Sequence, residues 1–305
     1  MKKKFELANL SKNLLYCVCF SICALNLTAC DDDDENGTQG NGPAPIGIPS
    51  SVVDGVRATS MSGVDVTYNE DGTIKEAEVD GNTLVFNYAS SRAIKVDPIR
   101  SLISITSSER ESERWIASDF AFNTSGFVTA YKLKYTDTDS REEMNIAYTF
   151  NYNADGQMQK ISMKTDGKDD EGSYSESGEI NYTYNNKVLE KIEAKSKNIT
   201  CSQTYEYTQA IKNTYNAMPL LLLPEELASD DCVFNVFAIT GYLGNAGANL
   251  PTAMTIKNTD LEDPSENSTE RYNLSYTLNE NKAIASYTLS GYGETMTFPC
   301  DWTNF

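Results

Sequence analysis

The residues that could do chemistry in this sequence are carboxylates rather than histidines. Asp and Glu together number 44 against 25 Lys and Arg, and there is no His, so the formal net charge is −19. The lack of His excludes Ser-His-Asp and Cys-His nucleophiles as well as His-ligated zinc. The sequence also carries no Walker loop and no GxGxxG motif after a strand. We therefore predict a protein that is not an enzyme and that needs no cofactor.

A pair of carboxylates could still cleave a glycosidic bond, because that reaction needs two acids at a set separation in a cleft. A sequence with this many acids holds many such pairs, and solvated strand faces account for most of them. A carboxylate-dependent glycoside hydrolase is therefore less favoured than a binding function.

The densest acidic segment after the N-terminal region is KTDGKDDEGSYSESGE, residues 164–179. We interpret it as a loop between strands. Four of its side chains offer the oxygen ligands that calcium prefers, namely Asp166, Asp169, Asp170 and Glu171. Their spacing is not that of an EF-hand, so a hydrated hairpin tip without metal is the favoured interpretation.

Aromatic side chains are the other candidates for ligand contact, because Tyr and Trp stack on apolar faces and carry a polar tip. The chain has 18 Tyr and 2 Trp, and most of the Tyr alternate with polar residues as strand core positions do. Tyr242, in a glycine-rich loop, is the first candidate for contact with a sugar. Trp115, beside the charged run ERESER, is the second.

The elements that would position these side chains are strands joined by a recurring turn. The turn appears as YNEDG at 68–72, FNTSG at 122–126 and YNADG at 152–156, and as the shorter YNNK at 184–187. Asn suits the first position of a type I turn, and the final Gly supplies the positive φ that closes a bulged hairpin. Flanking residues alternate with period two, as in residues 144–152, which indicates half-buried strands.

We therefore predict an all-β fold, an antiparallel hairpin meander that forms a curved sheet or a soluble barrel. A short helical insert is expected around residues 209–250, because AMPLLLLPEELASDDC (217–232) does not alternate and its Pro-Glu-Glu suits a helix start. The following residues, 236–254, are predicted to form a glycine-rich loop. The insert is expected to plug or cap the sheet.

The N-terminal residues predict where in the cell the protein is located. Residues 1–29 combine a basic start with a short apolar run, which is typical of a signal peptide. The run ends in Ala29 before Cys30, as in a lipobox, so we predict cleavage after Ala29 and lipidation of Cys30. Five acids (31–35) follow, and they resemble the surface-export signal of Bacteroidota lipoproteins. Residues 30–48 would form a flexible acidic tether, and residues 49–305 a single β-meander domain.

These features place the predicted protein at the outer membrane, held by lipid and exposed at the cell surface. The acidic charge disfavours nucleic acid as a partner. The cysteines that remain after Cys30 are Cys201, Cys232 and Cys300. An odd number allows at most one internal disulfide, and three buried thiols are the alternative.

Together, the lipobox, the Tyr-Asn-x-Asp-Gly hairpins, the Leu-rich insert, the loop GYLGNAGANLP (241–251) and the final Tyr-rich strands resemble the Bacteroides lipoproteins of the DUF4595 type. The resemblance covers about residues 50–305, although the regular turn is lost after Tyr184. It implies a porin-like fold without an assigned function and without catalytic residues to transfer. A membrane-spanning barrel ending in Phe305 is less favoured than a soluble one, since Pro299 lies in the last strand.

Two functions fit these observations. The first is a non-catalytic surface lipoprotein that binds an extracellular ligand such as a glycan. The second is a structural or accessory subunit that docks on an outer-membrane protein complex.

Overall fold

The computed structural model describes residues 49–79, 82–88, 99–101, 103–107, 113–138, 142–169, 172–197, 199–218 and 232–304. The predicted signal peptide, the predicted tether and Cys30 lie outside these residues. The strands of the main sheet are β1 (Val56–Met61), β2 (Val64–Tyr68), β3 (Ile74–Val79), β4 (Asn82–Tyr88), β5 (Ile99–Ser101), β6 (Ile103–Ser107), β7 (Glu113–Phe122), β8 (Val128–Asp137), β9 (Glu142–Tyr152), β10 (Met158–Asp169), β11 (Gly172–Asn185), β12 (Val188–Lys195), β13 (Ile199–Glu206), β16 (Ala253–Asp260), β17 (Ser268–Leu278), β18 (Ile284–Gly291) and β19 (Glu294–Asn304).

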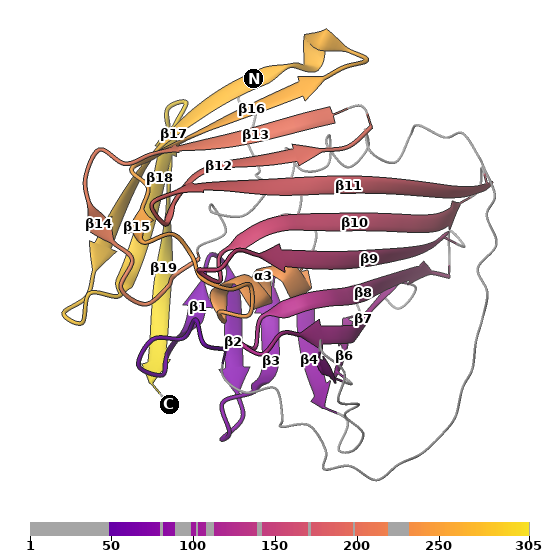
Figure 1. The fold of residues 1–305 in the computed structure, drawn as a ribbon, viewed down its shortest axis with the longest axis horizontal. Coiled ribbons are helices and arrows are strands. Elements are labelled where there is room, and N and C mark those ends of the chain that lie inside the picture. Colours follow the sequence, from indigo (N-terminus) through magenta and orange to yellow (C-terminus); the bar gives the residue numbers. More distant parts are fainter. Residues whose placement is uncertain are drawn as a thin grey trace.

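These strands form one 17-stranded antiparallel sheet in which neighbours along the chain also pair in space (Figure 1). β5 and β6 pair with different parts of β7, and β13 pairs with β16 across the insert. β1 pairs with β2 through one edge and with β19 through the other, so the pairings return to their start. The predicted all-β class and hairpin meander are confirmed. A small second sheet joins β14 (Ile211–Lys212) to β15 (Asn249–Leu250).

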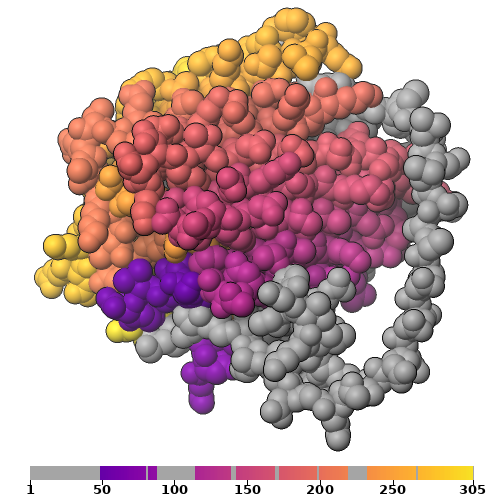
Figure 2. All heavy atoms as spheres, viewed as in Figure 1, coloured from indigo at the N-terminus to yellow at the C-terminus, as the bar shows by residue number. Residues whose placement is uncertain are grey.

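The strands alternate between an inner face and an outer face, as their period-two pattern predicts. On β9 the inward positions Tyr148 and Phe150 are buried, whereas their neighbours Ala147 and Thr149 are exposed. The outer face is polar, and on β11 it consists of Ser173, Ser175, Ser177, Glu179, Asn181 and Thr183. Figure 2 shows the outward side chains of β8–β13 as a continuous surface.

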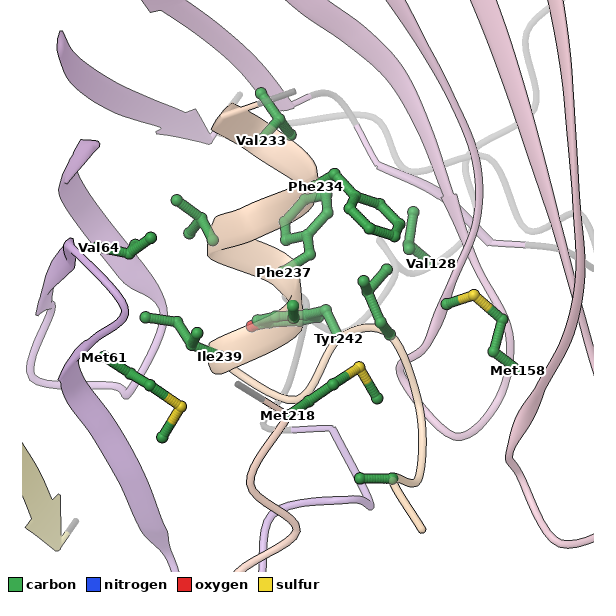
Figure 3. Packing of buried hydrophobic residues seen from close by; sticks show 14 of the residues in the cluster. Met61, Val64, Val128, Met158, Met218, Val233, Phe234, Phe237, Ile239 and Tyr242 are labelled. Atoms are coloured by element: carbon green, nitrogen blue, oxygen red, sulfur yellow. The ribbon is translucent and has the colours of Figure 1, made fainter. Parts of the chain in front are cut away.

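The interior is filled by α3 (Cys232–Ile239), whose residues 233–239 are all buried. Apart from Asn235 these residues are apolar, and a helix that is apolar nearly all round belongs in a core. On one side the rings of Phe234 and Phe150 stack with centroids 6.2 Å apart, and Phe237 lies 5.5 Å from Phe120. On the other side α3 contacts β1, β2 and β3 (Figure 3).

The insert therefore does plug the sheet, as expected, and its helix α3 lies within the predicted range 209–250. Residues 236–239 are helical rather than part of the glycine-rich loop, which begins after Ile239. The predicted helix start at Pro224 lies outside the described residues. Within the described residues, no helix combines the length and apolar character needed to cross a membrane. We call α3 together with the following loop (residues 240–250) the plug, and the loop itself the plug loop.

The recurring turns share one geometry. In the turn at 153–157, the Asn153 N–H donates to the Gln157 carbonyl at 2.9 Å, and the Gly156 N–H donates to the Asn153 carbonyl at 3.0 Å. The Asn153 side-chain oxygen accepts from the backbone N–H groups of Asp155 and Gln157, each at 3.0 Å. Gly156 has φ +73°, as the sequence pattern predicts. The turns beginning at Asn69 and Asn123 repeat this backbone pairing.

The turns also hold the plug loop by direct backbone contact. Three turns take part, through Val128 N–H to the Tyr242 carbonyl (2.9 Å), Asn245 N–H to the Gly156 carbonyl (2.8 Å) and Ala248 N–H to the Lys187 carbonyl (2.9 Å). The Asn245 side chain adds a bond to the Asp155 carbonyl at 2.6 Å. Buried backbone polar groups must find partners, and here the turns supply them. The turn repeat is thus a set of acceptors and donors placed around the plug loop.

The first turn reaches the plug through a buried arginine. Arg57 on β1 is only 2% exposed, and its guanidinium donates to the Gly72 carbonyl. It lies 5.2 Å from the ring centroid of Tyr68, at cation–π distance. Its charge also acts on the phenol of Tyr242 in the plug loop. Burial raises the pKa of Tyr242 to about 12, against the opposing effect of the Arg57 charge.

We expect Gly244→Ala to destabilise the protein more than Gly63→Ala. Both glycines have positive φ, at +89° and +81°, so each substitution carries a backbone strain of about 1–2 kcal/mol. Only at Gly244 would the new Cβ collide with backbone, lying 2.5 Å from the Gly156 carbonyl oxygen. Urea unfolding measures both. Equal losses would show that the plug loop does not approach the turn this closely.

We expect Arg57→Met to lower the free energy of unfolding by about 1–3 kcal/mol, because the Gly72 carbonyl and the Tyr242 phenol lose a buried partner. Tyr242→Phe should cost less, because it removes one hydroxyl. The double variant should lose less than the sum, as expected for groups in contact. Additive losses in urea unfolding would contradict the proposed contact between β1 and the plug loop.

Candidate functional site

The structure corrects the first sequence-predicted contact residue. Tyr242 is 2% exposed and belongs to the core rather than to a surface loop. Its ring packs against Phe122 and Phe237, with centroids 5.9 and 5.5 Å away. The glycine-rich loop turns inward because the repeated turns bind its backbone. A ligand approaching from solvent therefore does not meet this ring.

The second candidate, Trp115, lies near the start of β7, away from the plug, and is half-buried. Its ring lies against that of Tyr135 on β8, with centroids 4.5 Å apart and planes inclined at 41°. The two residues are direct cross-strand partners. Trp115 contacts the core on its inner side.

The register continues this pair into a row across five strands. Tyr135 is opposite Met144 on β9, Met144 is opposite Gly167 on β10, and Gly167 is opposite Tyr174 on β11. All five positions share the inner face, because the same alternation buries Tyr131, Phe150, Ile161 and Ile180 farther along these strands. We call Trp115, Tyr135, Met144, Gly167 and Tyr174 the aromatic row. Its members are half-buried, whereas inward residues near the plug are buried.

Gly167 has a defined place in this row. A Cβ built on Gly167 would lie 2.3 Å from the ring of Tyr174, so that ring lies directly over the Gly167 backbone. Glycine in a strand interior often marks such a close approach. The Tyr174 ring thereby covers β10 as well as its own strand, β11.

Polar groups lie beside the aromatic row on the same face. The next lateral row toward the plug contains Ile146, Thr165 and Glu176, which oppose one another across β9, β10 and β11. Glu176 is half-buried. Burial raises its pKa above the usual value, and the charge of Lys197 opposes this. On the other side of the aromatic row, Asp137 is opposite Glu142.

The predicted acidic loop is mostly strand. β10 continues to Asp169 and β11 begins at Gly172, so only residues 170 and 171 separate them, because the two strands keep pairing to the hairpin end. Asp166 points outward and accepts a hydrogen bond from Lys164 at 3.0 Å. A hydrogen bond from Ser175, and then Lys164, lowers the pKa of the Asp166 carboxyl. Asp170 and Glu171 lie outside the described residues, as does the side chain of Asp169. Among the described residues no cluster of three or more acids or cysteines could hold a metal.

Among the described residues, one small hollow is lined by residues of β10, β11, β12 and the insert, including Met158, Tyr184 and Met218, and it has room for about one water molecule. The three cysteines are thiols, with Cys201 and Cys300 buried and Cys232 half-buried. Of the two alternatives, one disulfide or three free thiols, the structure has three free thiols.

Of the site residues, sequence reasoning named Trp115 and missed Tyr135, Met144, Tyr174 and Glu176. Each is an inward position by alternation, which the sequence shows. Their alignment in adjacent lateral rows depends on the register of four hairpins, which alternation alone does not set.

Comparison with known proteins gives the fold but no activity. The chain is similar to a porin-like protein from Bacteroides vulgatus ATCC 8482, with a TM-score of 0.51 and 12% identity over 83% of this chain and 98% of that one. A porin-like protein from Bacteroides uniformis ATCC 8492 has a TM-score of 0.43 and 16% identity, over 82% of this chain and 94% of that one. No curated protein matches the sequence.

The sequence profile described as a domain of unknown function (DUF4595) with porin-like fold matches residues 66–286. This stretch runs from β2 into β18 and includes the repeated turns, the plug and the aromatic row. The chain belongs to the DUF4595 family.

Proposed function

We propose that this protein is a non-catalytic binding module that holds an extracellular glycan against the aromatic row. The observation that carries the proposal is the contact of Trp115 with Tyr135 at an end of the inner face that the plug leaves half-exposed. Aromatic rings that keep solvent contact can stack on the apolar faces of sugar rings, and the Tyr hydroxyl can bond to their hydroxyls.

The polar neighbours of the aromatic row support the same ligand class. Ligand sites combine mostly apolar walls with a few placed polar groups. Glu176 and Thr165 lie one lateral row away on the same face and can accept hydrogen bonds from sugar hydroxyls. A half-buried carboxylate forms stronger hydrogen bonds than a neutral acceptor does.

The docking alternative lacks such an observation. Among the described residues, the exposed large apolar side chains come from five segments of the chain, namely Val53, Val85, Leu261, Leu278 and Tyr292. A docking surface usually gathers such residues into one patch. The hydrolase alternative likewise needs two carboxylates across one bond, and the geometry of the aromatic row supports stacking instead.

We further propose that the module is displayed at the cell surface by a lipid on Cys30, after cleavage at Ala29. The support is the sequence of residues 1–35. The polar outer face of β11 also suits a domain surrounded by water.

Trp115→Ala should weaken glycan binding about tenfold, or roughly 1.4 kcal/mol, because the ring that stacks on the sugar is lost. Calorimetry on the purified whole protein, against a panel of cell-wall, host and dietary polysaccharides, measures this. Arg114→Ala is the matched control, because Arg114 is the exposed neighbour on the outer face. A panel in which no polysaccharide binds, or equal losses in both variants, would overturn the proposal.

Cys30→Ala should release the protein from the membrane fraction of the cells that make it, because several acyl chains supply the stable anchoring. Fractionation and immunoblotting measure the shift. In the unchanged protein, protease added to intact cells should remove the domain. Persistent membrane association of Cys30→Ala would count against a lipid anchor, and protection from protease would count against surface exposure.

A further inference from the structure

The aromatic row runs across the strands rather than along one of them. Its members come one each from β7, β8, β9, β10 and β11, and successive members are direct cross-strand partners. Neighbouring strands are spaced by about 4.8 Å, so the row from Trp115 to Tyr174 spans about 19 Å. A row of this length extends beyond the single ring of a monosaccharide and can contact several linked sugar rings at once.

The row contains two aromatic surfaces with a non-aromatic side chain between them. Trp115 and Tyr135 form the first, in mutual contact at 4.5 Å. Tyr174 forms the second, with its ring over Gly167. Met144 lies between them, on β9, and its flexible side chain can adapt to a ligand.

We propose that the bound glycan is an extended, uncharged chain that lies perpendicular to the strands and occupies two stacking subsites, at Trp115–Tyr135 and at Tyr174. This rests on the proposed function and adds to it the length and direction of the ligand. We expect an uncharged glycan because the protein is acidic. Its formal net charge is −19, and Asp137 and Glu176 lie on either side of the row. Polyanionic glycans would be repelled.

Gly167 provides a variant that moves one subsite without deleting it. In Gly167→Ala the new Cβ would meet atoms at the far end of the Tyr174 side chain, at 2.3–2.7 Å, so the ring must swing away. Because that side chain is flexible and half-exposed, we expect the fold to persist. Lys168→Ala is the matched control, one residue along β10 and exposed on the outer face.

The experiment is calorimetric titration of the whole protein in mild detergent with sugar ladders from monomer to hexamer. The ladders are β-1,4-linked glucose, β-1,4-linked N-acetylglucosamine and α-1,4-linked glucose, with a sulfated polysaccharide as the anionic probe. Affinity should rise at least tenfold from monomer to tetramer and then level off. Tyr174→Ala and Gly167→Ala should remove most of this gain and leave monomer binding intact, whereas Ser173→Ala and Lys168→Ala should keep it.

The outcomes separate this inference from the proposed function. A monomer that binds as tightly as the tetramer, with a loss in Trp115→Ala, would overturn the two-subsite inference and leave the glycan-binding function standing. Tighter binding of the sulfated probe than of any ladder would overturn the uncharged class. A lack of binding to every probe, together with an inactive polysaccharide panel, would overturn both the function and this inference.

Discussion

A ring of paired strands with apolar side chains on its inner face must fill its own interior, and in this protein one buried helix meets that requirement. Phe237 on α3 is in ring contact with Phe86, Phe120, Phe122, Tyr131 and Tyr242, which come from β4, β7, β8 and the plug loop. Without α3 these rings would surround a void, and protein interiors do not tolerate large voids. The curvature of the sheet and the position of the plug therefore depend on each other.

The plug in turn explains why the same turn recurs along the chain. A loop that passes through a core brings backbone N–H and C=O groups with it, and these need partners. Backbone groups of Val128, Gly156 and Lys187, each in a turn or directly after one, bond to the plug loop. Arg57 donates to the Gly72 carbonyl in the turn at 69–73. Placing each hairpin turn at one end of the sheet thus serves two purposes, because it reverses the chain and completes the hydrogen bonding of the plug.

Local features of this fold could be predicted from the sequence, and features that depend on register could not. The turns were predictable because the side chain of Asn153 and the positive φ of Gly156 are local requirements of the turn. The strands were predictable because the alternation of apolar and polar residues is also a local pattern. The C-terminal limit of the helix was not, since residues 233–239 are apolar except for Asn235 and show no clear amphipathic period to locate it. Tyr242 was predicted to be accessible to a ligand because a glycine-rich loop is normally at the surface, but the residue is buried. Trp115 could be named, but its partners could not.

The porin-like description concerns the arrangement of strands, and fold alone does not carry function. The two ends of this sheet differ in whether the plug covers their inner face. Inward aromatic residues near the plug, such as Phe120 and Phe150, are 0% and 3% exposed and serve as core. The same alternation beyond the plug places Trp115, Tyr135 and Tyr174 on the inner face with solvent still in contact. An aromatic residue at an inward position is therefore fully buried near the plug and keeps contact with solvent farther from it.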